Sequence, residues 1–318
     1  MKLLFIVTVL SVVNIFLQQP EIIFKHQNSD SLRMLFLGDV MLGRNIGKHI
    51  KEGIDPFFYT QQITKNYDIV NANLEGPITH TITCQKKAYS FKFSPNTAIM
   101  LASNNINMVS LANNHSLDCY STGLRDTKKY LTENKIGYFG GETLMESFII
   151  QEINNYKVAF LGIDLSIGAI PIQTFYPLVK KLDKENDFVV VNIHWGNEYE
   201  LNYSTAQQIV GHTLIDNGAD IIIGHHPHVI QPVEMYKNKL IFYSLGNFIF
   251  DQFTEQTTQG IAVEVVLNSK PTATARVWPY KRIGIQPIFF TKNRKEIFCN
   301  KFFQHITLHK KCNLNFIY

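Results

Sequence analysis

Several signals that often reveal a protein's function are absent from this sequence of 318 residues. It has no run of basic residues interleaved with aromatic ones, and its 30 Lys and Arg residues outnumber its 26 Asp and Glu residues only slightly, giving a formal charge of +4. These features argue against a nucleic-acid groove, so we expect no nucleic-acid partner. Internal repeats, low-complexity segments and heptads are also missing. An anionic small molecule or polymer remains compatible with this charge.

Cysteine is scarce, and the four residues Cys84, Cys119, Cys299 and Cys312 contain no Cys-x-x-Cys spacing. This excludes the usual zinc and thioredoxin-like motifs. In an oxidising compartment Cys84 can pair with Cys119, and Cys299 with Cys312, although four free thiols are an equally good interpretation.

Near the N-terminus, Lys2 precedes an uncharged apolar stretch from Leu3 to Leu17. We interpret residues 1–30 as a signal peptide or an N-terminal membrane anchor, since the stretch is shorter than the roughly 20 residues that span a bilayer. A buried N-terminal helix is the alternative. We therefore expect an exported protein in the cell envelope, either membrane-anchored or extracytoplasmic.

The chain is 45% hydrophobic, enough for a sizeable core, and from residue 33 short apolar runs alternate with longer amphipathic ones. This alternation predicts an α/β layered fold. The expected strands are Met34 to Leu37, Asp68 to Leu74, Met108 to Ala112, Val158 to Ile163, Phe188 to Ile193 and Ile221 to Ile223. The expected helices are Pro95 to Asn104, Gly123 to Asn134, which Asp118 and Ser121 are placed to cap, and Thr205 to Asn217.

After residue 228 the pattern changes to hairpins. Two extended runs, Gln231 to Tyr236 and Lys239 to Ser244, flank a short turn, and Ile261 to Leu267 predicts a further strand. The last 50 residues show no pattern that predicts structure.

Polar residues follow the expected strands at the points where they end. Asp39 follows the first strand, Glu75 the second, Asn114 and His115 the third, and His194 the fifth. The sequence Gly-His-His-Pro-His at 224–228 follows the sixth. Because ligands of open α/β sheets bind beyond the carboxyl ends of the strands, these residues are expected to converge on one site.

The residue types at these ends suit a metal, because carboxylates, neutral imidazoles and an Asn carbonyl are appropriate ligands for zinc, manganese or iron. On an extended segment His226 and His228 would point to the same side and could bind one ion or two adjacent ions. Taken alone, Asp39 is better explained as a turn cap, and His194 as a hydrogen-bonded or surface histidine, than as metal ligands. The histidine cluster after three isoleucines is harder to explain without a metal.

These residues also carry a family resemblance. The blocks are Gly38 to Arg44, Asn73 to Pro77, Ala112 to His115, His194 to Glu198, Gly218 to His228 and Tyr243 to Phe248. Together they resemble the CapA family of bacterial capsule synthesis proteins, which includes the PgsA component of poly-γ-glutamate production. The resemblance implies a domain over residues 31–268, with 269–318 as a C-terminal extension that packs on or completes it.

That family is similar in turn to calcineurin-like metallophosphoesterases, which implies a four-layer α/β/β/α sandwich and a site for one or two divalent ions (Mn, Zn or Fe). The resemblance implies six metal ligands: Asp39, Glu75, Asn114, His194, His226 and His228. It places His115 at the leaving group. Met41 stands where the wider pattern has a histidine, Glu75 replaces an aspartate, and the extra His225 leaves the register of the final pair open.

The resemblance implies a metal-dependent hydrolase acting on a phosphoester or a γ-glutamyl amide, with an anionic polymer or phosphoester as substrate. Arg44 could hold a phosphate or carboxylate of the substrate, although it could equally be an ordinary surface arginine. The alternative is a non-catalytic, membrane-associated assembly or export component of an exopolymer synthase. In that case its partners would be membrane-bound synthase subunits, and the metal site would be structural.

Overall fold

The computed structural model describes residues 31–167, 169–269, 272–303, 309–310 and 312–318. The expected signal peptide or anchor lies outside these residues. Within them, no helix combines the length and the hydrophobicity needed to cross a bilayer.

The first sheet contains ten strands. They are β1 (Leu32–Val40), β2 (Ile69–Leu74), β3 (Met108–Ser110), β4 (Gly137–Phe139), β11 (Asn247–Ile249), β12 (Gln259–Ser269), β13 (Thr272–Ile283), β14 (Gln286–Phe289), β15 (His309–Lys310) and β16 (Asn313–Ile317). Their order is β15-β16-β13-β12-β1-β2-β3-β4, with β11 beside β1 and β14 beside β13. The strands β1 to β4 and β11 are parallel, whereas β12 to β16 pair antiparallel.

The second sheet contains six strands. They are β5 (Phe148–Ile153), β6 (Tyr156–Asp164), β7 (Phe188–His194), β8 (Ile221–His225), β9 (Val233–Tyr236) and β10 (Lys239–Phe242), in the order β5-β6-β7-β8-β10-β9. The four central strands β6, β7, β8 and β10 are parallel. The predicted hairpin is confirmed as β9 and β10, and its turn residues Lys237 and Asn238 have φ angles of 47° and 60°.

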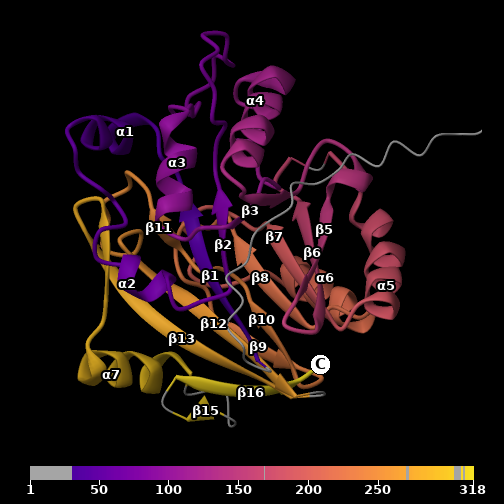
Figure 1. The fold of residues 1–318 in the computed structure, drawn as a ribbon. Coiled ribbons are helices and arrows are strands. Elements are labelled where there is room, and N and C mark those ends of the chain that lie inside the picture. The colour runs from indigo at the N-terminus through magenta and orange to yellow at the C-terminus, as the bar shows by residue number, and fades with distance from the viewer. Residues whose placement is uncertain (1–30, 168, 270–271, 304–308, 311) are drawn as a thin grey trace, which may run out of the picture.

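The sheets stack face to face, with most helices on their outer faces, whereas the helix nearest the C-terminus packs against the core between the sheets (Figure 1). The helices are α1 (Arg44–Lys51), α2 (Gln61–Thr64), α3 (Asn96–Ser103), α4 (Tyr120–Glu133), α5 (Phe175–Glu185), α6 (Thr205–Asp216) and α7 (Lys292–Phe302), with short 3-10 turns at Leu144–Glu146 and Ile172–Thr174. Residues of both sheets, such as Phe36 and Phe160, share one core cluster. Leu101 of α3 and Leu214 of α6 belong to two further clusters, one on each outer face. The expected four-layer α/β/β/α sandwich is confirmed.

The predicted strands and helices of the parallel parts are all present, with boundaries shifted by a few residues. The capping prediction is wrong. Helix α4 begins at Tyr120, its N-cap residue is Cys119, and no side chain caps it. The Asp118 carboxylate instead accepts a hydrogen bond from the Phe91 amide, and the Ser121 hydroxyl donates to Glu142.

Residues that carried no recognisable pattern also form regular structure. From Thr272 onward the chain adds β13, β14 and β16 to the first sheet and contributes α7. Both cysteine pairs form disulfides, Cys84 with Cys119 and Cys299 with Cys312, so the free-thiol interpretation is wrong.

Candidate metal centre

The polar residues at the strand ends meet where the parallel strands of both sheets finish. In the first sheet Asp39 of β1 lies in register with Asn73 of β2 and with Asn247 of β11. In the second sheet His194 of β7 lies in register with His225 of β8. Because parallel strands end at the same edge, the two sheets bring these ends together as expected.

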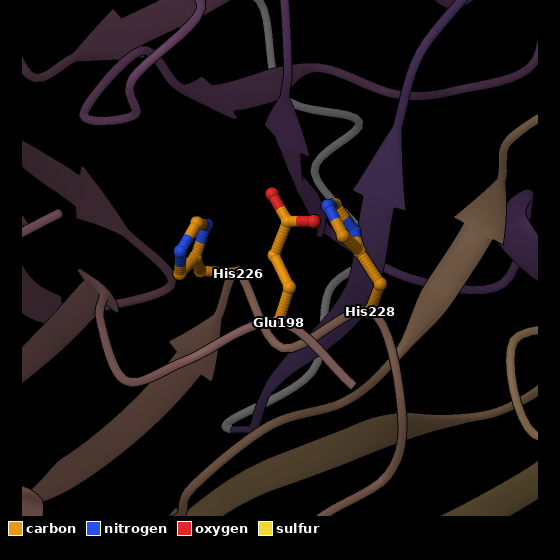
Figure 2. A group of neighbouring side chains, drawn as sticks. All are labelled: Glu198, His226 and His228. Carbon is orange, nitrogen blue, oxygen red and sulfur yellow. The ribbon is translucent and has the colours of Figure 1, made fainter. Parts of the chain in front are cut away.

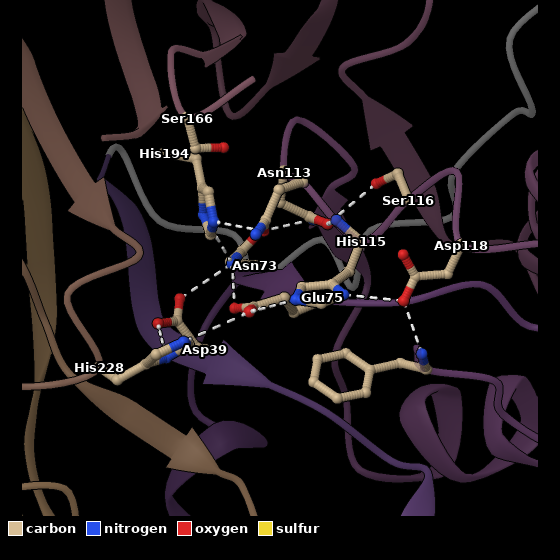
Figure 3. A network of polar contacts seen from close by, with 12 residues as sticks. Asp39, Asn73, Glu75, Asn113, His115, Ser116, Asp118, Ser166, His194 and His228 are labelled. Atoms are coloured by element: carbon tan, nitrogen blue, oxygen red, sulfur yellow. Dashed lines mark hydrogen bonds and ion pairs between the residues drawn. The ribbon is translucent and has the colours of Figure 1, made fainter. Parts of the chain in front are cut away.

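Asp39, Asn73, Glu75 and His228 form the buried centre of this region (Figure 3). The Asn73 amide donates to Asp39 Oδ1 at 2.9 Å and to Glu75 Oε2 at 3.3 Å. The His228 ring bridges the two acids, with Nδ1 at 3.2 Å from Asp39 Oδ2 and Nε2 at 3.6 Å from Glu75 Oε1. One ligand atom from each of Asp39, Glu75 and His228 lies within 4.8 Å of the others. We call these three residues the inner group.

The electrostatics of the inner group reflect two buried acids that face one imidazole. Burial acts to raise the pKa of Asp39, but hydrogen bonds from His225 and His228 outweigh it and hold that pKa well below its usual range. Burial raises the pKa of Glu75 well above its ordinary value. Burial acts to lower the pKa of His228, yet the charges of Glu75 and Asp39 raise it to about 9. The group therefore attracts positive charge.

A second group of possible ligands lies beside the first. One ligand atom from each of Glu198, His226 and His228 lies within 4.8 Å of the others, and we call these residues the outer group (Figure 2). Burial, followed by the charge of His228, lowers the pKa of His226 to about 4. A neutral imidazole with a free nitrogen is the form that binds a metal.

His194 and Asn114 complete this side of the site. The ring of His194 lies 4.6 Å from that of His226, and its Nε2 is 3.0 Å from Asn114 Oδ1. Burial, followed by the charge of His226, lowers the pKa of His194 well below its usual value, so this imidazole is also neutral. The structure thus brings all six sequence-predicted ligands to one end of the sandwich.

The His115 ring faces the inner group with Nε2, and Asp118 contacts its other nitrogen, Nδ1 (Figure 3). Its Nδ1 lies 2.8 Å from Asp118 Oδ2, and its Nε2 lies 4.0 Å from Glu75 Oε1. The Phe91 ring stacks on the imidazole at 4.0 Å between centroids, and Lys87 forms an ion pair with Asp118 at 2.5 Å. A carboxylate at Nδ1 favours a proton on that nitrogen and fixes the ring orientation.

Arg44 belongs to neither ligand group. Its guanidinium pairs with Asp251 at 3.1 Å and lies 5.5 Å from the Tyr89 ring and 5.6 Å from the Phe91 ring. Since Phe91 also stacks on His115, Arg44 lies at the margin of the site, with its side chain 40% exposed.

Met41 does not take the place of a ligand. Its side chain is fully buried in the hydrophobic cluster on the outer face of the first sheet, and its sulfur accepts a hydrogen bond from the Gly43 amide at 3.2 Å. A thioether is also a soft ligand, poorly matched to the carboxylates nearby.

Several functional residues were missed from the sequence. His225 was part of the predicted histidine cluster but had no role assigned, and its Nδ1 lies 3.0 Å from Asp39 Oδ1. Asn247 was not predicted as a site residue, and its Oδ1 lies 3.0 Å from His228 Nδ1. Glu198 and Asp118 were also not predicted as site residues. Their closeness in sequence to predicted site residues was the available signal, since Glu198 lies four residues after His194 and Asp118 lies three residues after His115. The expectation that His226 and His228 lie on an extended segment is wrong, because their φ angles are 97° and 58°.

The site chemistry fits a divalent cation. Within the part of the chain that the structure describes, three buried polar atoms of this site are poorly satisfied. His226 Nδ1 makes no hydrogen bond, and Asp39 Oδ2 and Glu75 Oε1 have only ion-pair contacts with the rings of His228 and His115. Burying such atoms without a partner is costly, and all three are atoms that coordinate zinc, manganese or iron. The site is therefore a candidate metal centre.

The fold and the site place this protein in the class of α/β/β/α sandwich proteins with a candidate metal centre of acids and histidines at the strand ends. The chain belongs to the bacterial capsule synthesis protein PGA_cap family, whose model matches residues 33–252. It is 34% identical to the capsule biosynthesis protein CapA of Bacillus anthracis over 80% of this chain and 68% of that protein. It is 32% identical to the PGA biosynthesis protein CapA of Bacillus subtilis (strain 168) over 80% of this chain and 73% of that protein. Among solved structures, purple acid phosphatase PPD1 from yellow lupin matches with a TM-score of 0.39 and 10% identity over 79% of this chain and 52% of that one.

Proposed function

We propose that this chain acts in the biosynthesis of an anionic capsule polymer of the poly-γ-glutamate type, through a metal-dependent hydrolase-like site. The inner group carries the proposal, because two buried acids and the imidazole between them stand opposite His115. The names of the two CapA relatives support the process, and the site supports the chemistry. The substrate would be a phosphoester or a γ-glutamyl amide.

One or two divalent ions would be held by Asp39, Glu75, Asn114, His194, His226 and His228. When bound, such an ion supplies Lewis-acid chemistry, since it polarises the bond to be cleaved and lowers the pKa of water. The neutral states of His194 and His226 suit this role, because a metal competes with protons for imidazole nitrogens.

His115 is the residue placed to move a proton. With Nδ1 directed at Asp118, its Nε2 faces Glu75 and can donate a proton to the leaving oxygen or nitrogen of a substrate bound there. Arg44 can orient a phosphate or carboxylate at the margin of the site if its pairing with Asp251 exchanges for the substrate.

A non-catalytic role is the second candidate, supported by the position of Met41. Because that side chain is withdrawn into the core, the first strand offers Asp39 as its only ligand to the centre among the residues described. The protein would then be an exported, membrane-associated assembly or export component that binds synthase subunits, and its metal would be structural.

Turnover by the full chain distinguishes the two candidates. Phosphomonoester, phosphodiester and γ-glutamyl substrates are offered with Mn²⁺ and with Zn²⁺ to the wild type and to an Asn114→Ala, His115→Ala variant. Hydrolysis that the variant loses by about a hundredfold or more supports the hydrolase. Equal behaviour of the two proteins, with metal bound in the wild type, supports the structural role instead.

A further inference from the structure

We propose that Glu198 is itself a ligand of the metal centre, supplied by the loop after β7 rather than by a strand end. The inference rests on the proposed metal centre but not on catalysis. Its ligand would be a divalent transition ion of the zinc, manganese or iron type, held by the outer group of Glu198, His226 and His228.

The geometry of the outer group carries this assignment. The Glu198 carboxylate lies between the imidazoles of His226 and His228 (Figure 2). His226 is only 9% exposed, and its Nδ1 is a buried atom without a hydrogen-bond partner among the residues described. A cation between the carboxylate and the two rings would offset the burial of these polar groups.

The loop that carries Glu198 is fixed against the histidine segment. The Trp195 amide donates to the His225 carbonyl at 3.1 Å, and the Tyr199 amide donates to the Pro227 carbonyl at 2.8 Å. These two hydrogen bonds flank Glu198 on both sides. The backbone therefore sets the position of the carboxylate relative to the two rings.

The two ligand groups share His228, which gives them different characters. The inner group is fully enclosed, whereas Glu198 is exposed to solvent and closes the outer group from outside. A solvent-facing carboxylate loses less hydration on binding but also binds in a higher dielectric, so its pull on the ion is screened. We expect the ion of the outer group to exchange more readily than that of the inner group.

The test is metal binding by the full-length protein, freed of metal by chelation. The variant Glu198→Gln removes the charge with little change of shape, and Glu200→Gln is its matched control, because Glu200 is an exposed acid of the same loop outside both ligand groups. Bound Mn²⁺ and Zn²⁺ per chain are measured by equilibrium dialysis with elemental analysis, and affinities by titration calorimetry. Circular dichroism of each metal-free variant checks the fold.

We expect Glu198→Gln to lose one class of bound ion or to weaken it by about tenfold or more, with Glu200→Gln equal to the wild type. Glu198→Asp, which keeps the charge on a shorter side chain, should recover part of the affinity. Wild-type affinity and stoichiometry in Glu198→Gln would overturn the inference, as would a wild type that binds no metal. A wild type that binds metal through Glu198 but hydrolyses nothing supports the inference and refutes only the hydrolase.

Discussion

The disulfide between Cys84 and Cys119 is expected to do more than stabilise the fold, because it joins the loop beyond β2 to the segment that carries Asp118. Beside the bridge, the Gln85 amide donates to the Asp118 carbonyl at 2.7 Å, and the Phe91 amide donates to its carboxylate at 2.6 Å. Replacing both cysteines by serine should therefore loosen the loop, Asp118 and, through it, His115.

The size of the global effect follows from the loop that each bridge closes. The Cys84–Cys119 bridge spans a sequence separation of 35 residues, for which loop-closure entropy gives about 4 kcal/mol. The Cys299–Cys312 bridge spans 13 residues, for which the same relation gives about 3 kcal/mol. The two removals should thus lower the free energy of unfolding by similar amounts and differ in their local effects.

The Cys299→Ser, Cys312→Ser variant is accordingly the matched control. Denaturant unfolding measures the global loss, and hydrogen exchange followed by mass spectrometry measures the local opening of residues 113–118. We expect faster exchange in that segment only when Cys84 and Cys119 are replaced. If exchange there is the same in both variants, or if losing the Cys84–Cys119 bridge costs less than about 1 kcal/mol, the reasoning is refuted.

Three further predictions concern the site. Asp118→Asn should lower turnover by about a hundredfold, because a neutral amide stabilises the protonated His115 ring less than a carboxylate does. The loss should be greatest for substrates with poor leaving groups, and an equal loss for good and poor leaving groups would contradict this role. Gly38→Ala should destabilise the protein by about 3 kcal/mol and reduce bound metal, because the added Cβ would lie 1.9 Å from the Gly246 carbonyl oxygen, beside Asp39. Thermal unfolding measures the loss, and an unchanged melting temperature would refute this prediction. At a free metal concentration of 100 times Kd, a bound ion should raise the free energy of unfolding by about 2.7 kcal/mol, and a chelator should remove this gain. Equal stability with and without metal would exclude a bound ion.

The parallel parts of both sheets were predictable because their strands are buried on both faces. A strand such as β7, with every residue buried, has to be an almost continuous apolar run, and the sequence shows that run. The polar residue that ends it, His194, then stands out because packing alone does not require it. Six metal ligands could be proposed in this way, with the family resemblance assigning their roles.

The rest of the fold depended on contacts that a local pattern does not encode. Strand β13 is held by antiparallel pairing with β12 on one side and with β16 on the other, and β16 follows in the chain only after β14 and α7. Asp118 has the right position and chemistry for a helix cap, yet the Phe91 amide and the His115 ring, brought close by tertiary folding, bind its carboxylate instead. Glu198 lies on an exposed loop without periodicity.

The backbone of the histidine segment gives an independent reason to expect a bound cation. His226 and His228 both have positive φ angles, a conformation that costs a residue other than glycine roughly 1–3 kcal/mol. Among the described residues, the same segment leaves His226 Nδ1 without a hydrogen bond and places His228 between two buried acids, so backbone strain and an unsatisfied polar atom occur together. A cation would satisfy Asp39, Glu75 and both imidazoles at once. The strain is therefore best explained as the cost of directing two neighbouring imidazoles at one ion, which couples metal binding to the stability of the whole sandwich.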